Sequence, residues 1–256
     1  MDIDHGYFKR NIWKDEFKLA DEIGLKKIEW VADIHSFDTN PIFENEGIKE
    51  IKILSQNTGV KVEHLCFNGL MEIPYTKKRI KEMVKKVIEA SYKCWIKLIV
   101  LPMIGKSRIN PTDFSGVKSF LNSFTSILKG KGMNLLIESD LNHNSYKLLI
   151  ESISSNYINI NYDTGNSAYW SYDPELEINS YGKYIKNVHI KDCTPKLYNV
   201  PLSKGDAKFD IILDNLYIRD YQGDFILETQ PGADSMLNAQ KYFNFLNKLV
   251  IKHFKK

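Results

Sequence analysis

The sequence predicts an α/β protein whose repeated strand–helix units form a (β/α)8 barrel, the TIM barrel. Short runs rich in β-branched residues alternate with longer stretches of helical periodicity along the whole chain. Each unit takes roughly 25 to 40 residues, which is the length of a βα repeat. The 256 residues accommodate seven or eight such units, and this number favours a closed barrel of ordinary length.

Seven strands are predicted, and helical stretches lie between most of them. The strands are Lys27–Val31, Val60–Cys66, Ile96–Leu101, Leu135–Glu138, Tyr157–Asp163, Ile185–Lys191 and Asp224–Glu228. The helices are Ile48–Gln56, Lys77–Tyr92, Asp113–Lys129, Ser145–Ile153, Phe209–Ile218 and, last in the chain, Ser235–Lys248. Alternation of this kind predicts a parallel sheet.

The first unit departs from this pattern. A helix over Lys14–Ile23, which ends at Gly24, precedes the first clear strand. The ten residues before it, MDIDHGYFKR, have little β-propensity. Either Ile3–Phe8 forms an abbreviated first strand, or the barrel lacks a strand at this place.

Composition indicates one domain over residues 1–256. Hydrophobic residues make up 43% of the chain and aromatic residues 12%, enough for a substantial core, and no Gly/Pro/Ser-rich stretch or charge run marks a linker. The chain does not open with a signal-like segment, and no apolar run approaches about 18 residues. Three cysteines, Cys66, Cys94 and Cys193, follow no metal-like spacing and are expected to be reduced thiols. We therefore expect a cytoplasmic protein without membrane contact.

The distribution of charge argues against a nucleic-acid partner. The formal net charge of +3 arises from lysines and acids spread along the chain, which is typical of a solvated surface. Nucleic-acid binding needs a clustered basic face, and the chain contains only four arginines. We therefore expect no nucleic-acid partner.

Four successive runs in the second half of the chain end on a residue that can bind a metal ion. LLIE ends at Glu138, ININYD at Asp163, IKNVH at His189 and DFILE at Glu228. Because the carboxyl ends of neighbouring parallel strands converge, these side chains are expected to meet. Three carboxylates and an imidazole suit Mn, Mg, Co or Zn. The sequence therefore predicts a divalent metal site.

Alternation along two of these strands supports a site. Asn159, Asn161 and Asp163 share one face, and Asn187, His189 and Lys191 share one face of the next strand. Barrel interiors are usually filled by Val, Ile and Leu, so an inward polar row indicates a hydrated or ligated barrel mouth. The alternative is an antiparallel strand with one wet face, which the intervening helices argue against.

Glu138 and Glu228 lie three strand steps apart, on far sides of a central ligand. Such a pair can take a proton from one face of a carbon and return it on another, while a metal between them would polarise the adjacent carbonyl and stabilise an enediolate. Glu29, in KKIEWV, either hydrogen-bonds a substrate hydroxyl or is a solvated strand end. His64, in VKVEHLC, is either a substrate contact or a structural histidine. His253 lies in a basic C-terminal tail that carries no motif.

The segments IEW, LLIESD, NYDTGNSA, YGKYIKNVHIKD, VPLSKGDAKFD and FILET resemble the xylose-isomerase-like TIM-barrel superfamily. They are most similar to its sugar phosphate isomerase/epimerase branch, which includes members from polysaccharide-biosynthesis clusters. The resemblance runs from about Phe17 to about Asn247. It implies a metal held by Glu138, Asp163, His189 and Glu228, with the two glutamates also acting as the acid/base pair. The family forms dimers and tetramers, so a homo-oligomer is consistent with it.

The resemblance also implies which residues handle the substrate. Lys191 contacts it in this interpretation, while Asp192 is structural. Asn166 stands where the family often has His, and Lys196 lies near Cys193, where the family commonly brings an Arg. Ser203 to Asp206 replace the family's GxG turn. The departures fall on substrate-handling loops rather than on metal positions.

These observations favour a metal-dependent isomerase or epimerase acting on a small sugar or sugar derivative. Dehydration of a keto-sugar or inosose on the same site is the main alternative, and it differs in that the product loses water. An abasic-site endonuclease of related fold needs further histidines around Asn166 and Asp206, which this chain lacks. A non-catalytic barrel with altered loops is the remaining alternative.

Overall fold

The computed structural model describes residues 8–229 and 235–254, and the chain divides into two compact units. The first unit contains residues 1–137 and 153–158, and the second contains residues 138–152 and 159–256. Each unit is built of parallel strands that alternate with helices, which confirms the predicted α/β class and the strand–helix repeat of a TIM barrel. The prediction of a single domain stays a prediction.

In the first unit four strands follow one another in chain order. They are β1 (Lys27–Ala32), β2 (Lys61–Phe67), β3 (Leu98–Pro102) and β4 (Asn134–Glu138), whose last residue belongs to the second unit. The helices are α1 (Trp13–Ile23), α2 (Asn45–Thr58), the short α3 (Gly69–Glu72), α4 (Lys78–Lys93), α5 (Phe114–Asn122) and α6 (Thr125–Lys131). Two 3₁₀ turns, η1 (Phe37–Thr39) and η2 (Pro41–Phe43), follow β1.

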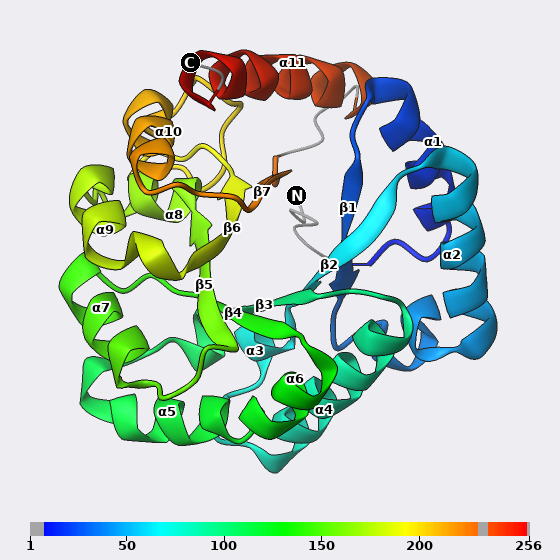
Figure 1. Cartoon of the computed structure of the whole chain (residues 1–256), viewed down its shortest axis with the longest axis horizontal. Coiled ribbons are helices and arrows are strands. Elements are labelled where there is room, and N and C mark those ends of the chain that lie inside the picture. Colours follow the sequence, from blue (N-terminus) through cyan, green and yellow to red (C-terminus); the bar gives the residue numbers. More distant parts are fainter. Residues whose placement is uncertain (1–7, 230–234, 255–256) are drawn as a thin grey trace. The chain divides into compact units, whose positions relative to one another are not determined.

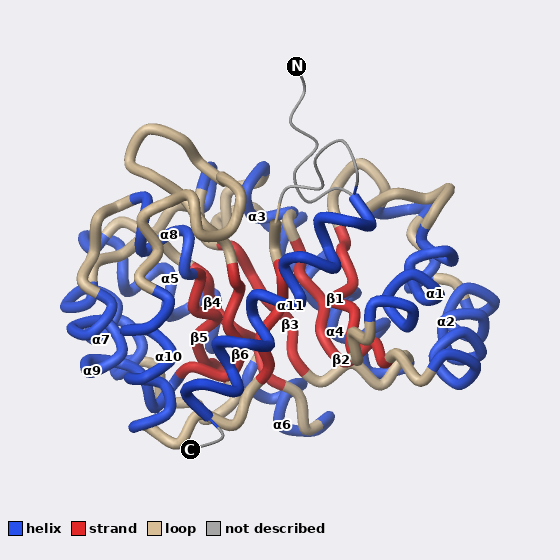
Figure 2. The backbone as a smooth tube through the Cα atoms, turned by 90° about the horizontal axis from the view of Figure 1, so that it is seen from above, coloured by secondary structure: helices blue, strands red, loops and turns tan. Residues whose placement is uncertain are grey.

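Helix α1 shows why the predicted elements form. Its buried residues Trp13, Phe17 and Ala20 recur at helical spacing and make one apolar stripe. The stripe packs toward α2 and β1, and the Trp13 ring meets Trp30 of β1 edge-on at 5.4 Å. Gly24, at φ 94°, ends the helix in the left-handed conformation that glycine adopts without strain. Figure 2 shows α1 and α2 on one side of β1 and β2.

In the described part of the second unit, three strands lie among five α-helices. The strands are β5 (Ile158–Asp163), whose first residue belongs to the first unit, β6 (Ile185–Ile190) and β7 (Asp224–Leu227), paired in parallel. The helices are α7 (His143–Ser152), α8 (Thr164–Tyr169), α9 (Pro174–Tyr181), α10 (Phe209–Ile218) and α11 (Ser235–Phe254). Helices α7, α9, α10 and α11 pack against one another in that order (Figure 1).

All seven predicted strands are confirmed, with boundaries that differ by a few residues at most. The prediction of a single helix over Asp113–Lys129 is wrong. This segment forms two helices, α5 and α6. The helix breaks between them because the Ser123 hydroxyl donates to the carbonyl of Phe120 and because the Phe124 side chain is fully buried in the core. The last helix continues six residues beyond the predicted Lys248.

The predicted abbreviated strand Ile3–Phe8 lies, except for Phe8, outside the described residues. Phe8 itself is not in a strand. Its N–H donates to Asp33 Oδ2 at 2.8 Å, and its ring packs on Trp30 at 5.2 Å. Within residues 8–229 and 235–254 there are therefore seven strands, one fewer than the eight of a complete barrel.

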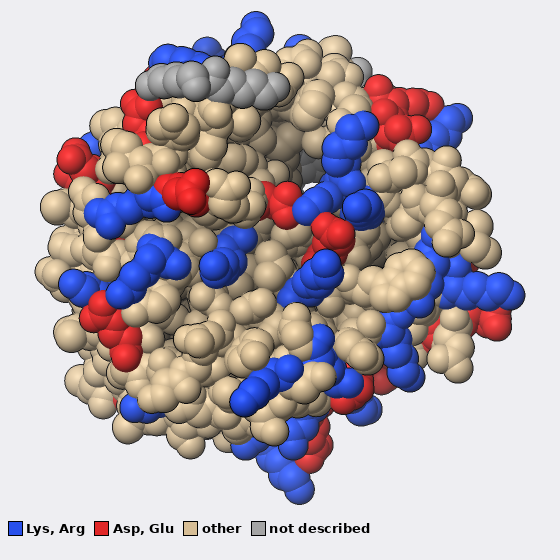
Figure 3. All heavy atoms as spheres, viewed as in Figure 1, with Lys and Arg blue, Asp and Glu red and all other residues tan. Residues whose placement is uncertain are grey.

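The surface carries interspersed charge. On the face drawn in Figure 3, lysines and arginines alternate with acidic side chains. Over the part of the chain that the structure covers, no helix is both long enough and apolar enough to cross a membrane.

Candidate metal centre

Four residues predicted as metal ligands come together inside the second unit. Glu138 ends β4, Asp163 ends β5, His189 lies in β6 and Glu228 follows β7. One ligand atom from each lies within 4.8 Å of the others. The parallel register explains the convergence, because Asp163 stands directly opposite His189 on the neighbouring strand. We call these four residues the quartet.

The quartet is buried on one side and open on the other. Glu138, Asp163 and His189 are each at most 5% exposed, whereas 44% of the Glu228 side chain is exposed. Burying three ionisable groups at one point is costly unless their charges are compensated. The open side at Glu228 is where a small molecule could approach from solvent.

Glu138 is held by neutral amides. Asn161 Nδ2 donates to its Oε2 at 2.8 Å, and Asn166 Nδ2 donates to its Oε1 at 3.2 Å. Asn187 Nδ2 in turn donates to Asn161 Oδ1 at 2.9 Å. The polar rows predicted along β5 and β6 are therefore a hydrogen-bonded network that orients this carboxylate.

One carboxylate oxygen of Asp163 accepts hydrogen bonds, and the other accepts none from the described residues. Its Oδ1 accepts from the N–H groups of Gly165 at 2.7 Å and Asn166 at 3.0 Å, so it caps the N-terminus of α8. Its Oδ2 is buried and accepts no hydrogen bond within the part of the chain described; Lys191 Nζ lies 3.9 Å away. A buried carboxylate oxygen without a donor indicates a site for a cation.

His189 and Lys191 surround Glu228. His189 Nδ1 lies 2.7 Å from Glu228 Oε2 and 3.4 Å from Glu138 Oε2. Lys191, 4% exposed, donates from Nζ to Glu228 Oε1 at 2.8 Å. The Lys191 backbone is fixed by Thr164, whose hydroxyl donates to the Lys191 carbonyl at 2.6 Å. Gly165 leaves room for this lysine, since a Cβ there would lie 2.7 Å from Lys191 Cγ.

The crowding of charge shifts several pKa values. Burial raises the pKa of Asp163 to about 7, with Lys191 opposing the shift and the carboxylates of Glu138 and Glu228 adding to it. Partial burial acts to raise the pKa of Glu228, but Lys191 and His189 outweigh it and hold that pKa well below its usual range. Burial acts to lower the pKa of Lys191, but Glu228 and Asp163 hold it well above its usual range. Lys191 is therefore a fixed positive charge beside the quartet.

The donor set fits a divalent cation. Four ligand atoms within 4.8 Å of one another can share one ion at the metal–ligand distances of about 2.0 to 2.6 Å found for zinc, magnesium and calcium. Three carboxylates with one imidazole match the hard to borderline metals Mg, Mn, Co and Zn. Such an ion would also keep Asp163 ionised, against the effect of burial.

The predicted substrate contacts fall in different places. Asn166 lies beside the quartet, between Glu138 and the hydroxyl of Tyr198. Lys196 is exposed in the loop after β6, where its N–H donates to Thr194 Oγ1 at 3.4 Å. Glu29 and His64 belong to the first unit and pair in register on β1 and β2, with His64 buried and Glu29 half-buried. The structure brings only Asn166 and Lys191 of this set to the quartet within the second unit.

Asp192 has the structural role that was predicted. Its Oδ2 accepts from the Gly205 N–H at 2.9 Å, and its Oδ1 accepts from the Ala207 N–H at 3.0 Å. A side chain at Gly205 would collide with Asp192 Oδ1. The carboxylate thus holds the loop that replaces the GxG turn.

Tyr198 is a site residue that the sequence did not reveal. Its hydroxyl donates to Asn166 Oδ1 at 3.0 Å, and Lys191 Nζ lies 4.4 Å from the centre of its ring. Tyr169 meets Tyr198 edge-on at 5.4 Å and also meets Trp170 at 5.3 Å. These three rings form an aromatic cluster next to the quartet. Tyr198 stands in an irregular loop without periodicity, so only the aromatic character of YWSY around Tyr169 offered a signal.

A family model described as a xylose isomerase-like TIM barrel matches residues 17–249. The chain belongs to this family. The match covers most of the chain and agrees with the strand–helix repeat and with the range over which the sequence resembles the family. It confirms the predicted fold class and the predicted superfamily.

Solved structures of the same fold include sugar-converting proteins. A xylose isomerase domain protein from Planctomyces limnophilus has a TM-score of 0.79 at 15% identity, with 93% of each chain covered. D-psicose 3-epimerase with D-tagatose from Clostridium cellulolyticum H10 has a TM-score of 0.75 at 14% identity, again with 93% of each chain covered. The IOLI protein with a binding zinc atom has a TM-score of 0.78 at 14% identity, with 95% of each chain covered. Among curated proteins no sequence matches the chain.

Proposed function

We propose that this chain is a metal-dependent isomerase or epimerase of a small sugar or sugar derivative. The observation that carries the proposal is the quartet, in which two glutamates flank an imidazole and a carboxylate with one uncommitted buried oxygen. Membership of the family and the likeness to a sugar epimerase structure support the same reaction class.

In this proposal the quartet holds a divalent ion, for which Mn, Co, Mg and Zn are the candidates. Bound there, the ion would polarise a substrate carbonyl and make the neighbouring carbon more acidic. Glu138 and Glu228 are the acid/base pair: the ionised carboxylate of one takes the proton from that carbon, and the other, which enters the step carrying a proton from solvent, returns that proton at the second face. Because Glu228 is the more exposed of the two, a proton that it takes from the substrate exchanges more readily with water.

Neighbouring residues position this pair. Asn161 and Asn166 orient Glu138, and Lys191 fixes Glu228. The aromatic cluster of Tyr169, Trp170 and Tyr198 offers apolar ring faces for the substrate beside the quartet. Direct substrate contacts from Lys191, Asn166, Lys196, Glu29 and His64 stay proposals. A cytoplasmic location, a role in polysaccharide biosynthesis and a homo-oligomeric state are likewise predictions.

The test does not require the substrate to be known in advance. A panel of ketopentoses, ketohexoses and keto-glycosides is incubated in D2O with the Mn-loaded protein, and NMR follows deuterium entering the carbon next to the carbonyl. Glu138→Gln and Glu228→Gln should each lower the exchange rate about 100- to 10,000-fold, the usual contribution of a positioned acid or base. Unchanged circular dichroism shows that the variants are folded.

Glu175→Gln is the matched control, because Glu175 is an exposed acid in the first turn of α9. Its exchange rate should equal that of the unmodified protein. Full activity in either site variant contradicts the proposed mechanism. A product lighter by one water molecule assigns the chain to the dehydratase alternative. Absence of bound divalent ions, together with no thermal stabilisation by Mn or Co, assigns it to the non-catalytic alternative.

A further inference from the structure

A cavity separate from the quartet lies within the first unit, at the amino-terminal ends of β2 and β3. It has a volume of about 560 Å³ and is lined by residues of α2, the start of β2 and the turn that joins α4 to β3. A volume of this size is typical of small-molecule sites, which range over roughly 300 to 1,000 Å³. None of the quartet lines it.

Trp95 forms one wall of this cavity in an unusual backbone conformation. It follows α4 at φ 66°, and the Ile96 N–H donates back to the Ser91 carbonyl at 2.9 Å, as at a helix end where glycine is preferred. A bulky residue in this left-handed conformation is strained relative to glycine. Trp95 is also 59% exposed, so burial of its side chain in the core does not offset the backbone strain. Such a residue is better explained by a ligand than by stability.

The cavity carries excess positive charge. Lys52 Nζ lies 4.0 Å from the centre of the Trp95 ring, and Lys61 and Lys97 also line the cavity. Glu63 is the acid of the lining, and Lys27 Nζ contacts it at 2.8 Å. The hydrogen bond from Lys27 lowers the pKa of Glu63, so this carboxylate is ionised and already neutralised.

The inner wall of the cavity is apolar. Ile51, Val62 and Cys94 are each buried to at least 95% and contribute hydrocarbon or thiol surface. Burial raises the pKa of Cys94 to about 11, so its sulfur is a neutral thiol at physiological pH. An occupant must therefore combine an apolar body with an anionic group.

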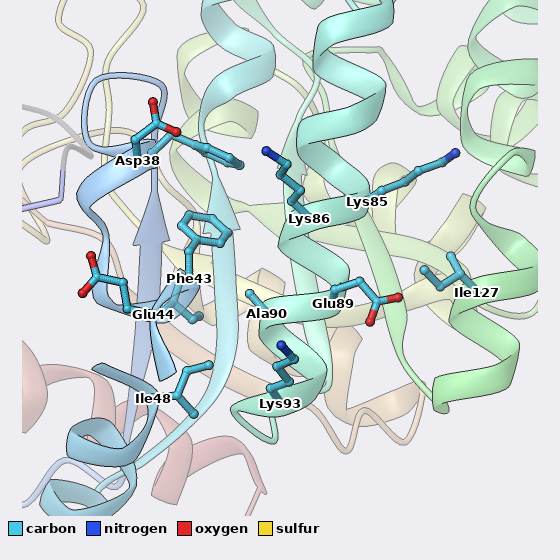
Figure 4. Close-up of a pocket in the computed structure, with 12 residues that line it drawn as sticks. Asp38, Phe43, Glu44, Ile48, Lys85, Lys86, Glu89, Ala90, Lys93 and Ile127 are labelled. Carbon is cyan, nitrogen blue, oxygen red and sulfur yellow. The ribbon is translucent and has the colours of Figure 1, made fainter. Parts of the chain in front are cut away.

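Another cavity of the first unit provides a contrast. It has a volume of about 620 Å³ and lies between α4 and the turns η1 and η2, with Phe43 and Ile48 on its apolar side (Figure 4). Its charged lining residues balance, with three lysines, Lys85, Lys86 and Lys93, against three acids, Asp38, Glu44 and Glu89. It is similar in size but has no excess charge to select an anion.

We propose that the cavity beside Trp95 binds a small organic anion that carries an aromatic or other apolar ring. The ring contacts Trp95 and the apolar wall, and the anionic group pairs with the ammonium groups of Lys52 and Lys97. Aromatic contact and charge pairing at a partly desolvated site together give a role to an exposed tryptophan at a strained position.

The probe is 8-anilinonaphthalene-1-sulfonate, an aromatic sulfonate whose fluorescence rises in apolar surroundings. Titration should give one saturable site. Trp95→Gly should weaken binding at least tenfold, while the protein stays folded, because glycine suits φ 66° without strain. Lys52→Met together with Lys97→Met should weaken binding about tenfold, equivalent to about 1.4 kcal/mol. The same double variant should bind the neutral N-phenyl-1-naphthylamine within twofold of the unmodified protein.

Lys86→Met together with Lys93→Met is the matched control at the charge-balanced cavity, and it should leave the affinity for the sulfonate unchanged. The proposal is overturned if Trp95→Gly binds the sulfonate as tightly as the unmodified protein does. It is also overturned if the two lysine pairs have equal effects, or if binding does not saturate. Thermal unfolding of each variant verifies that the affinities refer to folded protein.

Discussion

Glu138 and Glu228 belong to one cluster but are held by different kinds of group. Glu138 accepts hydrogen bonds from the neutral amides of Asn161 and Asn166, whereas Glu228 is contacted by Lys191 and His189. The ammonium and imidazole beside Glu228 and the amides beside Glu138 hold the two carboxylates by different contacts, and different surroundings are how paired acids divide their roles. The environment of each glutamate, rather than its residue type, therefore decides what it does.

Lys191 is expected to weaken metal binding. Its ammonium lies 2.8 Å from Glu228 Oε1 and 3.9 Å from Asp163 Oδ2, so it repels a dication that uses the same carboxylates. Lys191→Met removes the charge but keeps the apolar stem, and it should raise Mn²⁺ affinity about tenfold or more, as measured by isothermal titration calorimetry. Lys196→Met, at an exposed lysine, should have no effect. Weaker binding by Lys191→Met would instead show that this lysine is needed to hold Glu228 in place.

Asp163 is expected to make stability depend on pH when divalent ions are chelated. Its pKa is raised to about 7, against about 3.9 in an unfolded chain. The folded state therefore binds the proton more tightly, and this contribution to stability is complete below pH 4 and is lost as pH rises to 7. Asp163→Asn stays neutral and can still cap α8, so above pH 7 it should be about 2 to 4 kcal/mol more stable than the unmodified protein.

Urea unfolding in EDTA at pH 4 and pH 8 measures this difference. The variant and the unmodified protein should agree at pH 4 and separate at pH 8. Saturating Mn²⁺ should reverse the order at pH 8, because the aspartate binds the dication with a negative charge that the asparagine lacks. An equal difference at both pH values would refute the assignment of the effect to this carboxyl group.

The elements show which parts of the fold can be read from a sequence. Helix α4 and strand β5 were predicted because their periodicity is sustained over many residues and records burial directly. Helix α8 was missed because six residues are too few for periodicity, and it forms because Asp163 caps it. The break between α5 and α6 depends on where Phe124 finds space in the core, which is a tertiary effect.

Helix α11 is attached to α10 by a histidine that the sequence placed in an uninformative tail. His253 is 2% exposed, its Nδ1 lies 2.6 Å from Asp214 Oδ1, and its Nε2 lies 2.7 Å from Asp210 Oδ1. His253→Ala removes both contacts and leaves two carboxylates facing a gap. Because both carboxylates are partly exposed to solvent, the change should lower the free energy of unfolding by about 1 to 3 kcal/mol.

Equilibrium urea unfolding tests this prediction. Lys252→Ala, at an exposed lysine of the same helix, is the control. Equal losses in the two variants would show that the attachment of α11 does not depend on the buried imidazole.

At the scale of the whole molecule, the sequence predicted the candidate metal ligands better than the loop residues that surround them. The convergence of Glu138, Asp163, His189 and Glu228 could be predicted because strand ends in a parallel sheet have only one place to meet. The partner of Asn166 could not, because Tyr198 reaches it from a loop 32 residues later with no periodic signal. Loop positions depend on contacts such as those of Asp192 with Gly205, which leave no regular pattern.

The whole chain, if it is one domain as predicted, should respond to a metal ion that binds only one part of it. All four candidate ligands lie in the second unit. An ion at 100 times its Kd stabilises the folded state by about 2.7 kcal/mol. For a chain of this size that corresponds to a rise of about 5 to 10 °C in Tm.

Calorimetry with and without Mn²⁺ shows whether the two units unfold together, as one domain, or separately. A single cooperative domain gives one transition that moves upward as a whole, so the first unit is stabilised through the second. Glu228→Ala, which removes a ligand at the exposed side of the quartet, should abolish the shift and keep one transition. Two transitions, of which only one moves with Mn²⁺, would mean that the units unfold separately and that the single-domain prediction is wrong.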